Sequence, residues 1–93
     1  MKLKFTLGFK EKLERQIEFI ARDKPGAARK FKSDLLTQIK KIPSFPFKNR
    51  KSIFFDRDEI RDLTFKGYVV VYKINAEAKE IEVFGFVKYE EKP

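Results

Sequence analysis

Apolar and polar residues alternate at the start of the chain. In KLKFTL, residues 2–7, an extended backbone would place Leu3, Phe5 and Leu7 on one face. Gly8 interrupts this alternation, so the pattern predicts a short strand over residues 2–7. We expect this strand at an edge of the sheet or next to an edge, because it must reach the sheet across the helical segment that follows.

A helical period replaces the alternation from Phe9 onwards. Apolar residues three or four positions apart form a first stripe, made of Phe9, Leu13, Ile17 and Ile20. The sequence DKPG at residues 23–26 predicts that this helix ends near Arg22 and that Pro25 lies in the first turn of a second helix. The second apolar stripe consists of Ala28, Phe31, Leu35 and Ile39. Because Pro43 cannot continue a helix, the two stripes predict a helical hairpin that ends before it.

The rest of the chain is typical of β structure. Residues 60–65, 68–74 and 81–87 are rich in Val, Ile, Phe and Tyr. Lys66-Gly67 predicts a two-residue hairpin turn, and NAEAKE predicts a longer one. The segment YVVVYKI is apolar at successive positions, so we expect both faces of this central strand to be covered.

The order of these elements is β-α-α-β-β-β. It predicts an α+β fold in which a helical hairpin packs on one face of a mainly antiparallel four-stranded sheet. A chain of 93 residues is long enough for one core, so we expect a single domain over residues 1–93.

Composition excludes several classes of site. The chain has neither His nor Cys, which removes disulfides, Ser-His-Asp and Cys-His catalysis and the usual zinc sites. Any general acid or base must be a carboxylate, Lys or Tyr, and we expect no metal and no cofactor. The N-terminus has no long apolar run, and no segment approaches the roughly 20 apolar residues of a membrane span. We therefore expect a cytoplasmic protein with no membrane partner.

Charge indicates an acidic partner. The net charge is +8 and the sequence pI is about 9.8, which favours nucleic acid, the ribosome, anionic lipid or an acidic protein segment. Five basic residues in or beside the β region are the candidates for nucleic-acid binding: Lys48, Arg50, Lys51, Arg57 and Lys66. The alternative is that they form ordinary solvated loops in a Lys-rich, soluble protein.

Several short motifs, taken in order, resemble toxins of the RelE/ParE superfamily. RDL at residues 61–63 is similar to the R-[DE]-L strand end of that family, and GYVVVY at 67–72 is similar to its G-Y-x-[VIL]-[VIF]-Y strand. IEVF at 81–84 is similar to the family's V-x-V last strand, and DKPGAARKF at 23–31 resembles its N-P-x-A-A-x-x-F turn. Together the motifs span nearly the whole chain.

The resemblance implies a toxin of a type II toxin–antitoxin system that is held inactive by a cognate antitoxin in a hetero-oligomer. Such toxins are associated with growth arrest and plasmid stabilization. One branch of the family cleaves mRNA in the ribosomal A site, whereas the other poisons DNA gyrase without being an enzyme. We favour ribosome-dependent mRNA cleavage, because most basic residues of the β region are expected near one cleft.

One position departs from the ribonuclease pattern. Ribonuclease members often carry Arg directly after the tyrosine, but here Val69 cannot donate a hydrogen bond to phosphate. Asp62, on the preceding strand, would repel one. The candidates for catalytic groups are therefore Arg61, Lys88 and Tyr89: the two cations would pair with phosphate, and the tyrosine would stack on a base or transfer a proton.

Each candidate also has a structural interpretation. Arg61 could pair with a neighbouring acid, and Lys88-Tyr89 could be an exposed strand end. Tyr68 and Tyr72 share one face of a strand, where core packing is the simpler explanation. For the whole protein, the alternatives are a gyrase poison that acts through surface contacts, an inactive member that retains antitoxin binding, and an RNA-binding module.

Overall fold

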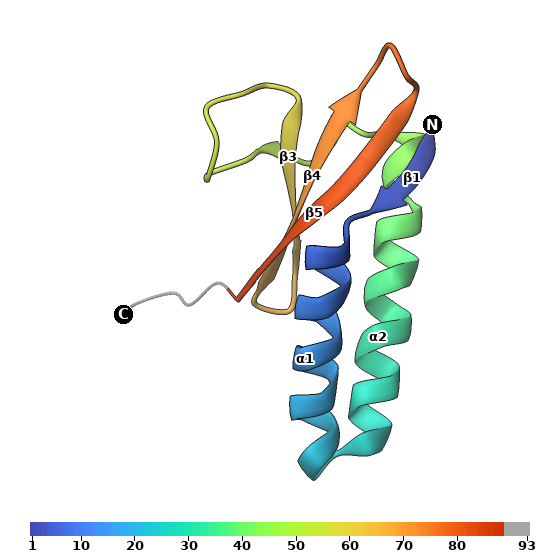
Figure 1. The fold of residues 1–93 in the computed structure, drawn as a ribbon, viewed down its shortest axis with the longest axis vertical. Helices are drawn as coiled ribbons and strands as arrows, with labels where there is room; N and C mark the ends of the chain where they lie inside the picture. Colours follow the sequence, from blue (N-terminus) through green and yellow to red (C-terminus); the bar gives the residue numbers. More distant parts are fainter. Residues whose placement is uncertain (89–93) are drawn as a thin grey trace.

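The computed structural model describes residues 1–88 and confirms the α+β class and the order of elements. β1 (Lys2–Phe5) leads into α1 (Leu7–Asp23) and α2 (Pro25–Lys40), and a single 3-10 turn, η1, follows at Ile42–Ser44. The remaining strands are β2 (Arg50–Lys51), β3 (Ile60–Phe65), β4 (Tyr68–Asn75) and β5 (Glu80–Lys88). Figure 1 shows the helical hairpin beside the sheet, with the far ends of both helices extending past it.

The sheet has five strands in the order β1-β5-β4-β3-β2, so the expectation of four strands was wrong by one. The extra strand, β2, has only two residues, and Arg50 pairs with Asp62 and Lys51 with Arg61. Two consecutive basic residues carry no alternating pattern, so the sequence alone could not reveal this strand. β1 lies at the opposite edge, as expected, and is parallel to β5, whereas the other neighbouring strands are antiparallel.

The first strand is shorter than predicted, because Thr6 ends it. The Thr6 side chain accepts a 3.2 Å hydrogen bond from the backbone N–H of Phe9, which caps the N-terminus of α1. Leu7 and Gly8 therefore belong to the helix, and Leu7 is largely exposed instead of continuing the apolar face of the strand. The second helix ends at Lys40, and Pro43 lies in η1.

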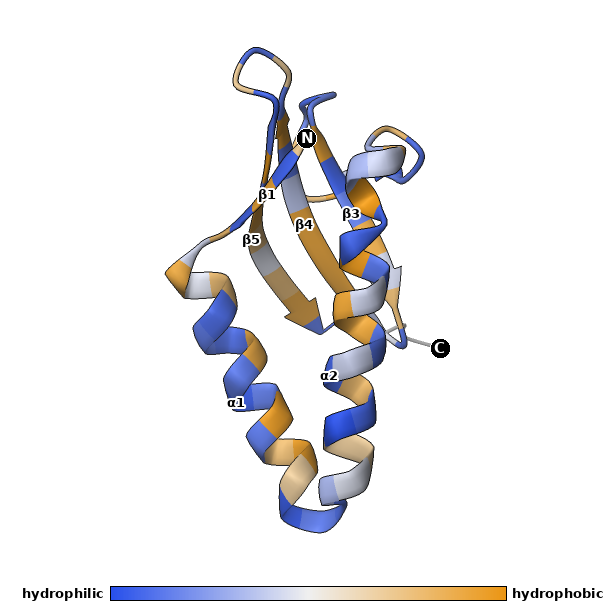
Figure 2. Ribbon diagram, turned by 90° about the vertical axis from the view of Figure 1, so that its right-hand side faces the viewer, coloured by the Kyte–Doolittle hydropathy of each residue, from blue (hydrophilic) through white to orange (hydrophobic). Residues whose placement is uncertain are grey.

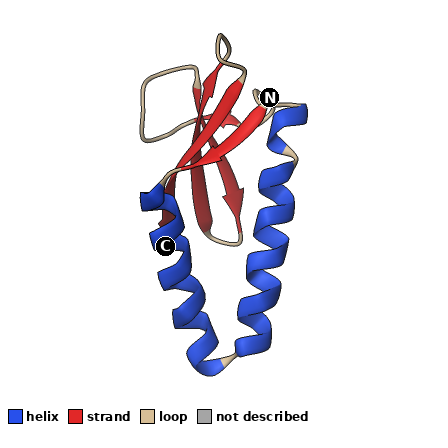
Figure 3. Cartoon of the chain, turned by 45° about the vertical axis from the view of Figure 1, so that its right-hand side comes forward, coloured by secondary structure: helices blue, strands red, loops and turns tan. Residues whose placement is uncertain are grey.

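One face of the sheet packs on the helical hairpin and forms the main core. Figure 2 shows the apolar stripes of α1 and α2 turned toward the strands, and Figure 3 shows the sheet lying against the hairpin. The Tyr68 and Phe86 rings stack with centroids 5.0 Å apart, and Phe31 meets Tyr68 edge-on at 5.2 Å. The core-packing interpretation of Tyr68 and Tyr72 is thus confirmed, because both are buried in this cluster.

Two backbone features shape the hairpins on either side of β4: the turn between β3 and β4, and a register shift between β4 and β5. Lys66 and Gly67 both have positive φ, of 47° and 80°, as the two-residue turn between β3 and β4 requires. Farther along, the pairing of β4 with β5 shifts register between Val71 and Tyr72. Gly85 lies opposite Val71 there, and a Cβ at Gly85 would be 2.9 Å from the Val71 Cβ, which is too close.

We predict that Gly85→Ala lowers the free energy of unfolding by about 1–3 kcal/mol, because the added methyl group must displace the Val71 side chain or the strand. Gly8→Ala is the matched control, since a Cβ at this helical position meets nothing within 4 Å. The control should change the free energy of unfolding by less than about 0.5 kcal/mol, because Gly8 lies in the first turn of α1 and not in its interior. Urea unfolding followed by circular dichroism measures both changes, and equal stability of the two variants would contradict the prediction.

Candidate functional site

The outer face of the sheet, which faces away from the helices, is apolar at its centre. Ile60, Val69 and Val71 form a second buried cluster, with the partly buried Phe84 packed against it. Val69 is only 1% exposed, so the position where ribonuclease members often carry Arg holds a buried aliphatic side chain. Phe55, from the loop between β2 and β3, covers this cluster by packing edge-on against Phe84 at 5.7 Å.

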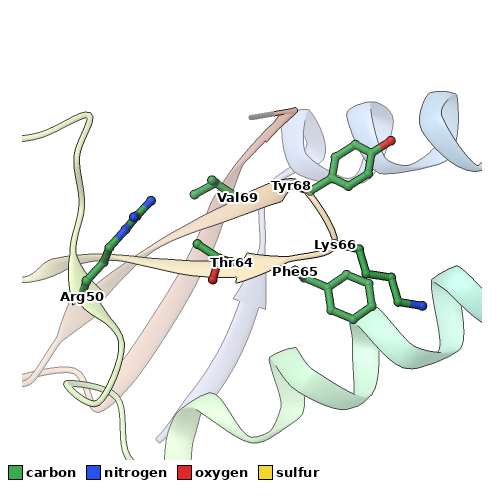
Figure 4. Close-up of a pocket in the computed structure, with 7 residues that line it drawn as sticks. Arg50, Thr64, Phe65, Lys66, Tyr68 and Val69 are labelled. Carbon is green, nitrogen blue, oxygen red and sulfur yellow. The ribbon is translucent and has the colours of Figure 1, made fainter. Parts of the chain in front are cut away.

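A cleft of about 550 Å³ opens beside this cluster, where β3 ends and β4 begins, near the turn that joins them (Figure 4). Arg50 and Lys66 are the two predicted nucleic-acid-binding residues that line it, with Thr64 and Val69 between them. Figure 4 shows the two cations at opposite ends, with the Lys66 side chain directed away from Arg50. The Lys66 ammonium instead lies 3.8 Å from the carboxylate of Asp34 on α2.

Asp62 holds β2 and the following loop against the outer face. Its side chain is fully buried, and its Oδ2 accepts a 2.9 Å hydrogen bond from the backbone N–H of Ile53 and lies 3.5 Å from Nη2 of Arg50. Asp62 Oδ1 is buried without a hydrogen-bond partner among residues 1–88. The buried Asp62 carboxylate is therefore paired with Arg50, whose side chain is 45% exposed, and it is not displayed toward the cleft as a group that repels phosphate.

Arg61 points to the opposite side of β3 and is occupied by the neighbouring loops. Its guanidinium donates to the carbonyl and carboxylate oxygens of Asp58 at 2.8 and 2.7 Å, and to the carbonyl oxygens of Asn49 at 3.1 Å and Phe47 at 3.4 Å. The same group lies over the Phe47 ring, 4.9 Å from its centroid. With its side chain only 13% exposed, Arg61 acts as a structural clamp, which favours the structural interpretation over the catalytic one.

Tyr72 completes this clamp from inside the core. Its hydroxyl donates a 2.6 Å hydrogen bond to the carbonyl oxygen of Pro46 and accepts one of 3.1 Å from Nδ2 of Asn49. Burial raises the pKa of the Tyr72 hydroxyl above its usual value, so it remains a protonated donor. Arg61 on β3 and Tyr72 on β4 thus hold the segment between α2 and β2 against the face of the sheet that packs on the helices.

The remaining basic candidates are dispersed over the surface. Lys51 donates a 2.8 Å hydrogen bond to Asp56, which raises the pKa of Lys51 and lowers that of Asp56. Arg57 is bonded to Glu59 at 2.7 Å. Exposed pairs of this kind hold their partners only weakly.

Lys48 lines a separate cleft beside the end of α2, together with Lys41 and Phe45. Lys88 is exposed at the end of β5, opposite Tyr68, and Tyr89 lies outside the described residues. Within residues 1–88, the structure therefore does not bring the predicted catalytic and nucleic-acid-binding residues together at one site.

The chain is similar to known proteins in both sequence and fold. The model of the ParE toxin of the type II toxin–antitoxin system parDE matches residues 3–92. The chain belongs to the ParE toxin family. A solved structure of the chromosomal ParDE toxin–antitoxin system from P. aeruginosa superposes with a TM-score of 0.79 at 19% identity, covering 97% of each chain, which shows a common fold. No curated protein matches the chain.

Family membership confirms that the protein is the toxin component of a type II toxin–antitoxin system and that it has an antitoxin partner. In the described part of this ParE toxin, no group of three or more His, Cys, Asp or Glu side chains is arranged to hold a metal ion. None of the helices that the structure describes is both long enough and apolar enough to cross a membrane.

The hydrogen bond between Tyr72 and Asn49, and the cleft that contains Lys41 and Phe45, could not be predicted from the sequence. The prolines around Phe45 in IPSFPF were the available signal, since they indicate an ordered and non-helical segment. Which side chains that segment would contact depends on strand register and could not be read from the sequence.

We predict that Tyr72→Phe lowers the free energy of unfolding by about 1–2 kcal/mol, because the Pro46 carbonyl and the Asn49 amide lose their common partner. Tyr68→Phe is the matched control, since the Tyr68 hydroxyl makes no hydrogen bond within the described residues, and it should change stability by less than about 0.5 kcal/mol. Urea unfolding at pH 7 measures both variants.

The same pair of variants tests the raised pKa of Tyr72. A raised pKa in the folded state means that the stabilising contribution is complete below the unfolded value, near 10.0, and is lost as the pH rises through the folded value. The stability advantage of the wild-type protein over Tyr72→Phe should therefore shrink above pH 10. An advantage that stays constant or grows up to pH 11.5 would contradict this assignment.

Proposed function

We propose that this ParE toxin acts as a non-enzymatic poison of DNA gyrase, through contacts made by its surface. The observation that carries the proposal is the apolar centre of the outer sheet face, where Val69 and Val71 are buried and Arg50, a cation of the neighbouring cleft, is paired with Asp62. Cleavage of a phosphodiester requires groups that stabilise charge developing on the phosphate, and aliphatic side chains provide none.

The cations around this face support the same conclusion. Arg50 is paired with Asp62, and Lys66 is directed toward Asp34 on the other side of the β3–β4 turn. Arg61, the first catalytic candidate, donates its hydrogen bonds to loop oxygens. A ribonuclease would need two or three such groups converging within hydrogen-bond distance of one phosphate.

Family membership also supports a gyrase target. Within the superfamily that the sequence resembles, the ParE branch is the one directed at gyrase. The preference for mRNA cleavage drawn from the sequence depended on basic residues gathering near one cleft. Among the basic residues of the described range 1–88, Arg50 and Lys66 alone line that cleft, so this argument loses most of its weight.

We predict that the purified toxin inhibits ATP-dependent supercoiling by gyrase and causes cleaved plasmid DNA to accumulate, and that prior mixing with the antitoxin prevents both effects. The physical reason is that surface contacts with gyrase need no converging catalytic groups. Supercoiling and DNA-cleavage assays measure this directly, and mapping of RNA 5′ ends after brief expression in growing cells provides the second readout.

The two readouts separate the alternatives. Growth arrest with inhibited gyrase and no new RNA ends supports the proposal. New 5′ ends at fixed positions within translated codons, together with unaffected gyrase, would overturn it in favour of ribosome-dependent mRNA cleavage. Normal growth with unaffected gyrase would identify an inactive member that binds only its antitoxin.

A further inference from the structure

A second cleft, of about 360 Å³, lies where the C-terminal end of α2 meets the segment that leads to β2. We call it the 38–49 cleft. Its lining residues are Gln38, Lys41, Ile42, Ser44, Phe45, Lys48, Asn49 and Leu63. This volume is in the range of pockets that hold a small ligand or a few side chains.

The walls of the 38–49 cleft are fixed in place. Tyr72 and Arg61 hold the backbone of residues 46–49 through the hydrogen bonds described above, and η1 places the N–H of Phe45 3.1 Å from the carbonyl oxygen of Ile42. A second turn joins the N–H of Lys48 to the carbonyl oxygen of Phe45 at 3.1 Å. A preorganised wall of this kind reduces the entropy that is lost when a partner binds.

The cleft combines an apolar surface with unpaired positive charge. Phe45 is 70% exposed although it is held in a hydrogen-bonded turn, and the half-buried Leu63 provides aliphatic surface beside it, whereas Ile42 is only 2% exposed. No carboxylate lines the cleft, and neither Lys41 nor Lys48 makes an ion pair within residues 1–88. The partner that complements this surface is apolar at one position and acidic on both sides of it.

We propose that the 38–49 cleft binds an acidic segment of the cognate antitoxin, with one apolar side chain between Phe45 and Leu63 and carboxylates near Lys41 and Lys48. The exposed ring of Phe45 would also accept a stacked base, so a single-stranded nucleic acid is the competing occupant that the test below separates. The antitoxin is favoured because it is the partner that a toxin of this system requires, and because a net charge of +8 favours association with an acidic chain. This inference depends on membership of the toxin–antitoxin family and not on gyrase as the target.

The test uses the full-length toxin, purified from a complex with its antitoxin and separated from it. We measure the dissociation constant for the antitoxin by titration calorimetry for Lys41→Glu/Lys48→Glu and, separately, for Phe45→Ser. We expect each to weaken binding by roughly tenfold or more, as removal of a central contact typically does. Circular dichroism and thermal unfolding establish that the variants are folded.

Matched controls come from the same chain. Lys12→Glu/Lys79→Glu makes the same change in net charge at two exposed lysines that do not line the cleft. Phe19→Ser removes a ring that is 61% exposed on α1, which matches the exposure of Phe45. We expect the controls to bind the antitoxin within about twofold of the wild-type protein.

Each outcome decides the proposal. Weaker antitoxin binding by the cleft variants alone supports it, whether or not the toxin inhibits gyrase. Antitoxin binding that is weakened no more than in the controls overturns it. In that case, cleft variants that no longer inhibit gyrase would assign the cleft to gyrase binding. Cleft variants that lose affinity for a single-stranded oligonucleotide would assign it to nucleic-acid binding.

Discussion

The fold depends on one constraint: strand β4 is apolar on both faces and must be covered on both. Its alternate side chains, such as Tyr68 and Tyr72, pack against the helical hairpin, while Val69 and Val71 pack on the outer face. The central position of β4 in the sheet follows from this requirement, since a strand buried on both faces is unfavourable at an edge. The hairpin covers one face, and the loop that carries Phe55 covers part of the other.

Two consecutive charged residues on β3 organise the segment between α2 and β3. Because successive side chains of a strand point to opposite faces, Arg61 and Asp62 face opposite sides of the sheet edge. Arg61 holds residues 47–49 on the side of the helices, and Asp62 holds Arg50 and Ile53 on the outer side. The segment therefore crosses from one face to the other at β2. Arg61 and Asp62, which in the sequence form part of the RDL motif, thus have a structural role.

These features determine which charges are exposed on the surface of this ParE toxin. The centre of the outer face is closed by aliphatic and aromatic side chains, and the cations around it are paired or dispersed. The positive charge that has no internal partner lies instead at positions such as Lys41 and Lys48, beside an exposed ring. Such a surface favours association with an acidic partner, and its association rate should fall as the salt concentration rises.

The sequence by itself determined the α+β class, the helical hairpin and the three long strands, because apolar periodicity and the Pro and Gly signals act over a few neighbouring residues. It also indicated the family, through motifs spread along the whole chain. It could not reveal β2, the partner of Asp62 or the clamp formed by Arg61 and Tyr72, because these contacts join residues brought together by strand register. The folded structure was needed to show that Lys48 lies in a different cleft from Arg50 and Lys66, since a list of basic residues carries no information about the faces to which they point.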